Sequence, residues 1–130
     1  RGLAADGRAP CRLFDVAAAR PVPVDVEPVD FGSPAVHWDR DGRHSSYEKV
    51  DRGHQRFRLI RVDSHTGGAT NVIDETADTF LWTAHTEFIG ARPVTWLDDT
   101  AEVIHCTERS GWRHLDLIDA RAGERKHRVT

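Results

Sequence analysis

Residues 57–67 read Phe57-Arg58-Leu59-Ile60-Arg61-Val62-Asp63-Ser64-His65-Thr66-Gly67, an apolar strand followed by a tight turn. Hydrophobic residues recur here with a period near two, which is typical of a half-buried β-strand. The turn ends on glycine, the residue that reaches positive φ without steric cost. Similar apolar bursts, rich in β-branched and aromatic residues, lie at 11–16, 44–50, 102–107 and 114–118. The pattern predicts an all-β chain.

This strand and turn recur along the chain. The form Asp-x-x-x-Gly of residues 63–67 returns at 119–123, and a degenerate first copy lies at 15–19. Trp38 before an Asp-Gly turn is likewise repeated by Trp96 before Asp98-Asp99. The copies follow one another at similar spacing, and repeats of about 40–50 residues with four short strands each are typical of β-propeller blades. We therefore predict blades built from four-stranded antiparallel sheets.

The blade interpretation changes what the length of the chain means. Its 130 residues would suit one ordinary domain. Divided into blades, they contain a partial blade at residues 1–30 and two further blades at residues 31–80 and 81–130. Closed propellers have about four to eight blades, so we expect an incomplete propeller of two to three blades. Its open edges would favour self-association or low stability. An immunoglobulin-like sandwich is the alternative fold, which the constant spacing of the repeats disfavours.

The composition argues against several classes of partner. The chain has 18 Lys plus Arg and 21 Asp plus Glu, a net charge of −3, with the signs interspersed. No basic block long enough for nucleic acid is present, and the run 125–128 is interpreted as a solvated strand. No apolar run approaches the roughly 18 residues of a membrane span. The sequence contains no methionine, so we expect a chain processed or excised from a longer protein, whose compartment it does not indicate.

Neither the cysteines nor the histidines have the spacing of a metal site. Cys11 and Cys106 stand far apart and are predicted to be buried free thiols. The eight histidines include no His-Glu-x-x-His and no close pair. We predict neither a metal nor a cofactor.

Two segments resemble a known family. Asp51-Arg52-Gly53-His54-Gln55-Arg56, which continues into the strand quoted above and Thr66-Gly67, is similar to a propeller stretch of bacterial dipeptidyl peptidase IV-type enzymes of the prolyl oligopeptidase group. The segment 107–117 resembles that family's Ser-Glu-Arg-Asp-Gly-Trp-x-His-Leu-Tyr-Leu, with Ser110 and Asp116 in place of its Asp and Tyr. Asp74-Glu75 and Thr79-Phe80 match in order and spacing. The resemblance covers roughly residues 31–130.

The resemblance implies a serine peptidase that removes N-terminal dipeptides with Pro or Ala as the second residue. In that family a propeller covers an α/β-hydrolase domain, whose nucleophile sits in a Gly-x-Ser-x-Gly elbow. This chain contains no Gly-x-Ser-x-Gly, and the family's paired glutamates are not recognisable in it. We therefore expect a non-catalytic fragment that gates access of peptides to a hydrolase domain of the same parent. The alternative is a propeller fragment of a TolB-like protein-binding or scaffold module.

A few residues are candidates for a structural or functional role. Glu108, Arg109, Trp112 and His114 form the densest polar and aromatic cluster, predicted as an ion pair with a tryptophan packed between blades. The functional alternative for this cluster is a contact with the tunnel or with the hydrolase domain. Trp38 and Trp96 are expected to be structural. The resemblance further implies that Arg92 could face the extended substrate-binding site.

Overall fold

The computed structural model describes residues 7–31, 34–81, 92–97 and 100–130. These residues form ten β-strands and no helix. The strands are β1 (Leu13–Asp15), β2 (Arg20–Val22), β3 (Val36–Trp38), β4 (His44–Val50), β5 (Arg56–Asp63), β6 (Ala69–Thr76), β7 (Val94–Leu97), β8 (Glu102–Thr107), β9 (His114–Asp119) and β10 (Glu124–Arg128). The prediction of an all-β chain is confirmed. No helix among the described residues is long and apolar enough to cross a membrane.

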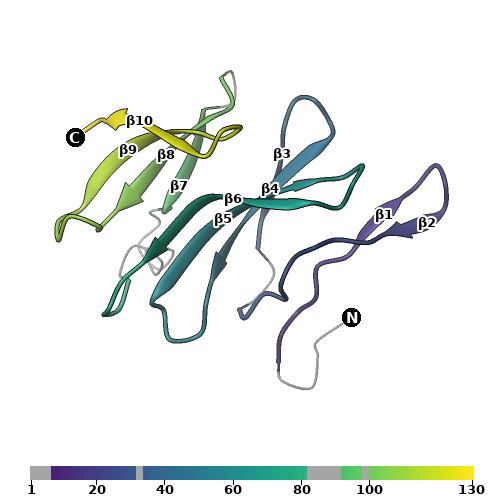
Figure 1. Cartoon of the computed structure of the whole chain (residues 1–130), viewed down its shortest axis with the longest axis horizontal. Coiled ribbons are helices and arrows are strands. Elements are labelled where there is room, and N and C mark those ends of the chain that lie inside the picture. Colours follow the sequence, from purple (N-terminus) through teal and green to yellow (C-terminus); the bar gives the residue numbers. More distant parts are fainter. Residues whose placement is uncertain (1–6, 32–33, 82–91, 98–99) are drawn as a thin grey trace.

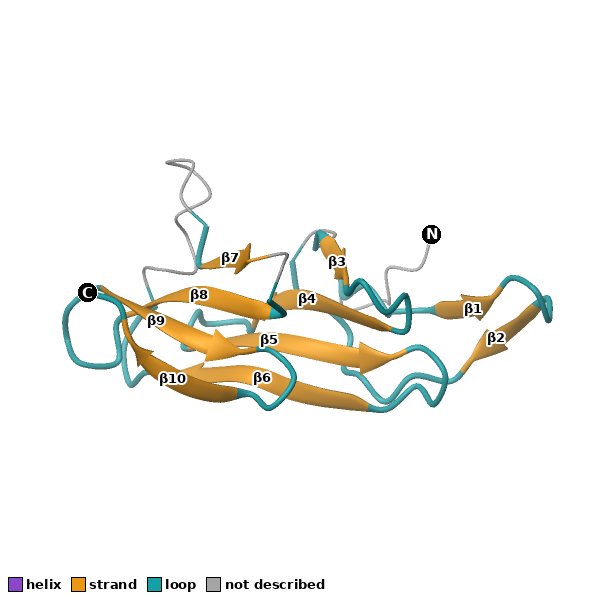
Figure 2. Ribbon diagram, turned by 90° about the horizontal axis from the view of Figure 1, so that it is seen from above, coloured by secondary structure: helices purple, strands orange, loops and turns teal. Residues whose placement is uncertain are grey.

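The strands form two four-stranded sheets and one hairpin. Each large sheet is an antiparallel meander of consecutive strands, β3-β4-β5-β6 and β7-β8-β9-β10. The β1-β2 hairpin lies beyond the first of these sheets, on the side away from the second (Figures 1 and 2). In an immunoglobulin-like sandwich, consecutive strands would instead be divided between the two sheets. The structure is that of a partial β-propeller, as predicted.

The two meanders pack face to face through an apolar core. Paired residues of neighbouring strands share a face, so one face of the first sheet carries Phe57 and Leu59, and the facing side of the second carries Val94 and Val103. Phe57, Leu59 and Val103 are at most 2% exposed. Alternation along each strand therefore places the apolar residues between the sheets, as the period of two in the sequence requires.

The opposite face of the first sheet is covered by the N-terminal segment. Tyr47, Ile60 and Val62 of this face are buried against Val29, with Val24 and Val26 packed beside them. The segment is held by backbone hydrogen bonds, among them one of 2.9 Å from the amide of Asp25 to the carbonyl of Gly67. The first sheet is therefore enclosed from both sides.

The three repeated hairpin turns share one geometry. The fifth residue of each has positive φ, with values of 51° at Ala19, 74° at Gly67 and 69° at Gly123. In the second and third turns the amide of this residue donates to the carbonyl of the leading aspartate, over 2.7 and 2.8 Å. Ala19 shows that even the degenerate first copy keeps the left-handed backbone that normally selects glycine.

Both cysteines are free thiols. Cys106 is half-buried, but Cys11 is exposed. The prediction of a buried thiol is therefore wrong for Cys11, because it precedes the β1-β2 hairpin, whose strands contain no buried residue.

Candidate functional site

A buried carboxylate joins the two large sheets. Glu75 of β6 is 1% exposed, and its Oε2 contacts His105 Nε2 at 2.8 Å and accepts a hydrogen bond of 2.7 Å from the Thr107 hydroxyl. Its Oε1 accepts one of 3.1 Å from the amide of Glu108. Both side-chain partners project from β8, whose alternation puts them on the same face as the core residue Val103. The network anchors the end of β8 to the neighbouring sheet.

The hydrogen bonds determine where the charge in this network lies. His105 lies between the two sheets, with Nε2 against Glu75 and Nδ1 3.2 Å from the carbonyl of Pro93. Burial raises the pKa of Glu75, but hydrogen bonds from His105, Thr107 and the Glu108 amide outweigh burial and hold its pKa below the ordinary value. The carboxylate therefore stays ionised inside the interface, where it is satisfied by three donors.

The turn between β8 and β9 is held by this network. The amide of Arg109 donates to the Thr107 hydroxyl over 3.2 Å, and that of Gly111 to the carbonyl of Glu108 over 2.8 Å. Glu108 forms an ion pair with Arg113 at 2.9 Å, whereas the guanidinium of Arg109 reaches the carbonyl of Asp74 at 3.4 Å. The ion pair of Glu108 is thus made with Arg113, a residue outside the predicted cluster. The sequence missed this partner because the pairing depends on how the turn folds back on itself.

Trp112 lies at the tip of this turn. Its side chain is 78% exposed, so the expectation that it packs between blades is wrong in this structure. It lines a pocket of about 620 Å³ together with Phe80, Leu81 and Arg109. His114 lies apart from this pocket and contacts the carbonyl of Thr130 through Nδ1 at 3.1 Å.

The other sequence candidates lie on the first strands of the two sheets or, for Arg92, just before one of them. Trp96 faces the preceding sheet and stacks on His37, with ring centroids 3.8 Å apart and planes 8° from parallel. Trp38 is 50% exposed and faces the β1-β2 hairpin across a pocket lined by Phe14. Arg92 is exposed and immediately precedes Pro93, whose carbonyl accepts hydrogen bonds from β8. The structure thus leaves Arg92 outside the Glu75 network.

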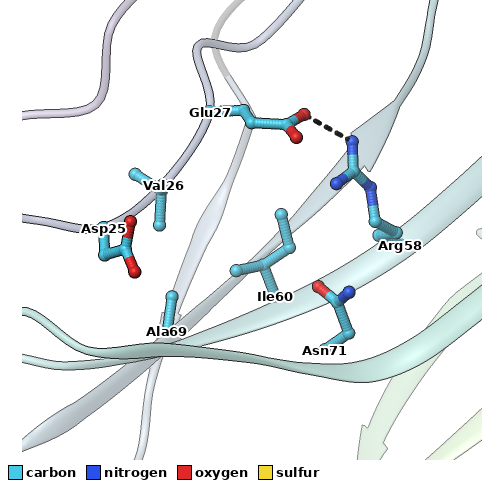
Figure 3. Close-up of a pocket in the computed structure, with 7 residues that line it drawn as sticks. All are labelled: Asp25, Val26, Glu27, Arg58, Ile60, Ala69 and Asn71. Atoms are coloured by element: carbon cyan, nitrogen blue, oxygen red, sulfur yellow. Dashed lines mark hydrogen bonds and ion pairs between the residues drawn. The ribbon is translucent and has the colours of Figure 1, made fainter.

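A second polar junction lies between the N-terminal segment and the first sheet. Glu27 and Asp51 both contact Nη2 of Arg58, at 3.0 and 2.6 Å, and the Arg58 side chain is only 6% exposed. Figure 3 shows Glu27 and Arg58 at the edge of a pocket that is also lined by Asp25 and Asn71. The charge of Arg58 is balanced by two carboxylates. The contact with Glu27 ties the N-terminal segment to the first sheet, as Glu75 ties the first sheet to the second.

The structure also assembles a cluster that the sequence interpretation missed. Asp39, Asp41 and His44 bring one potential metal-ligand atom each to within 4.8 Å of one another. Asp39, however, pairs with Arg61 at 2.6 Å. Asp41 contacts His44 Nδ1 at 2.6 Å and accepts two backbone amides, so hydrogen bonds from the backbone and side chain of His44 and from the Arg43 amide lower its pKa. These contacts explain the cluster as the scaffold of the Asp-Gly turn.

The sequence profile of the dipeptidyl peptidase IV (DPP IV) N-terminal region matches residues 14–130. The chain belongs to this family. The match begins upstream of the segments whose resemblance is visible by eye, and it includes the degenerate first hairpin. No curated protein matches the chain significantly.

A crystal structure supports the DPP IV-type fold. The neighbour, described as a putative dipeptidyl aminopeptidase IV from Bacteroides ovatus, superposes with a TM-score of 0.56 at 19% sequence identity. The alignment covers 85% of this chain but 15% of that one, so the chain spans a small part of that protein. At this identity the similarity establishes the fold alone.

Proposed function

We propose that the chain is the non-catalytic propeller part of a DPP IV-like serine peptidase. In this proposal it controls the access of peptides to an α/β-hydrolase domain elsewhere in the parent chain. The observation that carries the proposal is the DPP IV N-terminal profile over residues 14–130. The stacking of two meander sheets supports it, and so does the lack of a Gly-x-Ser-x-Gly elbow in the sequence. The blades would comprise residues 1–30 in part, 31–80 and 81–130.

Two exposed features support a role beyond structure. Arg109 is exposed in a turn whose base is fixed by the Glu75 network, which suits contact of Arg109 with the hydrolase domain. Arg92 is exposed beside the anchored Pro93, which suits contact with an extended peptide. Trp38, Trp96, Glu108 and His114 serve structural roles in this proposal.

The first experiment separates the two parts of the proposed protein. The purified chain and its parent are incubated with an Ala-Pro reporter, and release of the dipeptide is measured. We expect release by the parent and none by the chain, since the chain supplies no nucleophile elbow. Release by the purified chain would overturn the non-catalytic assignment. A parent without any α/β-hydrolase domain would overturn the peptidase assignment and favour the TolB-like scaffold.

Arg92 is tested in the parent enzyme. Arg92→Ala should raise KM for a hexapeptide substrate by roughly fivefold, the effect of one lost charge-assisted contact, with kcat little changed. Arg121→Ala is the matched control, because Arg121 is an exposed arginine in the turn between β9 and β10, away from Arg92 at the start of β7. Equal KM values for both variants would exclude a substrate role for Arg92.

A further inference from the structure

Ring side chains from distant parts of the chain meet at one end of the first large sheet. His54, in the turn after β4, makes a T-shaped contact with Phe31, with centroids 4.9 Å apart and planes at 81°. The same imidazole stacks on Phe80, which follows β6, with centroids 5.2 Å apart and planes at 29°. His54 thus lies between one ring that precedes its sheet and one that follows it. Offset and edge-on contacts of this kind are the favourable arrangements for rings.

The turn after β8 repeats the turn after β4. In each, a glycine with positive φ directly precedes the ring residue, Gly53 at 91° before His54 and Gly111 at 86° before Trp112. Both turns lie at the same end of their sheets, opposite the hairpin turns (Figure 1). Trp112 therefore takes the position in the second sheet that His54 takes in the first.

His54 has an aromatic ring on each side, whereas Trp112 has one on a single side. Phe80, which precedes the second sheet, lines the same pocket of about 620 Å³ as Trp112. Nothing among the described residues covers the rest of the indole, which is 78% exposed. The turn itself is held in place by Glu75 and Thr107, so the indole is presented from a fixed support. A large exposed ring on such a support is typical of a docking point.

The two phenylalanines around His54 occupy matching positions in the repeat. Phe31 follows Asp15, the leading aspartate of the first hairpin turn, by nearly the same step as Phe80 follows Asp63 in the second. The same step taken from Asp119 in the third turn ends beyond Thr130, at roughly position 136. A third ring at that position would lie against Trp112 in the way that Phe80 lies against His54.

We propose that Trp112 receives an aromatic side chain from the polypeptide that follows β10, extending the row Phe31, His54, Phe80 and Trp112. This inference rests on the proposed function, in which the parent chain continues. The face of the incoming ring would pack on the indole and close the open side of the pocket. The contact would join the second large sheet to the next blade, as the rings around His54 join the first sheet to its neighbours.

The test follows the solvent exposure of each tryptophan in the parent protein. The parent is labelled with 5-fluorotryptophan, the Trp112 resonance is assigned with Trp112→Phe, and its ¹⁹F shift is compared between H₂O and D₂O. We expect the solvent isotope shift of Trp112 in the parent to be at most about half that of a fully exposed indole. Replacing the ring near position 136 with alanine should raise that shift at least twofold. Trp38, on the far side of the first sheet, is the internal control and should not change.

Two outcomes would overturn the proposal. The first is a parent sequence without an aromatic residue within a few positions of 136, and the second is a Trp112 isotope shift that the alanine variant leaves unchanged. The readout needs no enzymatic activity. A parent that lacks dipeptidyl peptidase activity but shows the protected indole would reject the proposed function and keep this inference.

Discussion

At the scale of single residues, a glutamate at the same position of two successive repeats contacts the sheet that follows it. The step from Glu27 to Glu75 equals that between the hairpin aspartates Asp15 and Asp63. Each glutamate reaches the face of the following sheet, Glu27 at Arg58 and Glu75 at His105. Glu75 is fully buried, whereas the side chain of Glu27 is 65% exposed. Buried carboxylates contribute stability only when all their hydrogen bonds are made, so Glu75 is the more sensitive position.

Glu75→Gln tests this directly. The amide would present donor hydrogens to donors already in place and leave buried groups unsatisfied, which should lower the free energy of unfolding by about 2–4 kcal/mol. Urea denaturation followed by circular dichroism measures the difference. Glu124→Gln, on the exposed strand β10, is the control and should change little. Equal stability of the two variants would refute the role assigned to Glu75.

The pH dependence of stability follows from the same carboxylate. The pKa of Glu75 is lower in the folded chain than in the unfolded one, so its contribution is complete above the ordinary glutamate pKa and is lost as the pH falls through the folded value. Stability of the wild type should therefore fall more steeply below about pH 4 than that of Glu75→Gln. Urea denaturation from pH 7 to pH 3 measures both slopes. Parallel curves would contradict this assignment.

At the scale of elements, the hairpin turns share a backbone but differ in their surroundings. A Cβ on Gly67 would lie 1.7 Å from the carbonyl oxygen of Pro23, whereas on Gly123 its nearest neighbours would be 3.5 Å away. The glycine at 67 is therefore required twice, by its positive φ and by the close approach of the N-terminal segment. Gly123 is required by φ alone.

Alanine substitutions separate these two requirements. Gly123→Ala should cost about 1–2 kcal/mol, the penalty for the left-handed backbone. Gly67→Ala carries the same penalty and also forces two backbone segments apart, for a total of about 2–5 kcal/mol. Thermal unfolding of both variants measures the difference. If Gly123→Ala were the more damaging, the N-terminal segment would not pack against this turn as described.

At the scale of the whole molecule, the outer face of the last sheet is open. The register of β8 and β9 places Ile104, Cys106, Leu115 and Leu117 on the face opposite the core, and all four are only half-buried. The corresponding face of the first sheet is covered by the second sheet. An uncovered apolar sheet face favours association.

We therefore expect the isolated chain to self-associate through this face. Sedimentation velocity should show species larger than the monomer, with a fraction that rises with concentration. Leu117→Lys should shift the distribution towards monomer because it places a charge in the centre of the face, while Arg121→Lys should not. A monodisperse monomer at high concentration for the unsubstituted chain would contradict the expectation.

The sequence by itself determined the strands, the repeated turns and the family of this protein. These features depend on residues close together in the sequence. Alternation sets the buried face of a strand, and glycine permits positive φ. The residues that resemble the family, Glu108–Leu115, are consecutive. Tertiary structure alone decided that Glu108 pairs with Arg113, that Trp112 is exposed, and that Glu75 is the centre of the interface. Glu75 in the sequence is one acidic residue among 21. Its role arises because packing brings β6 to β8 from a distant part of the chain, and burial turns an ordinary carboxylate into one that must be satisfied.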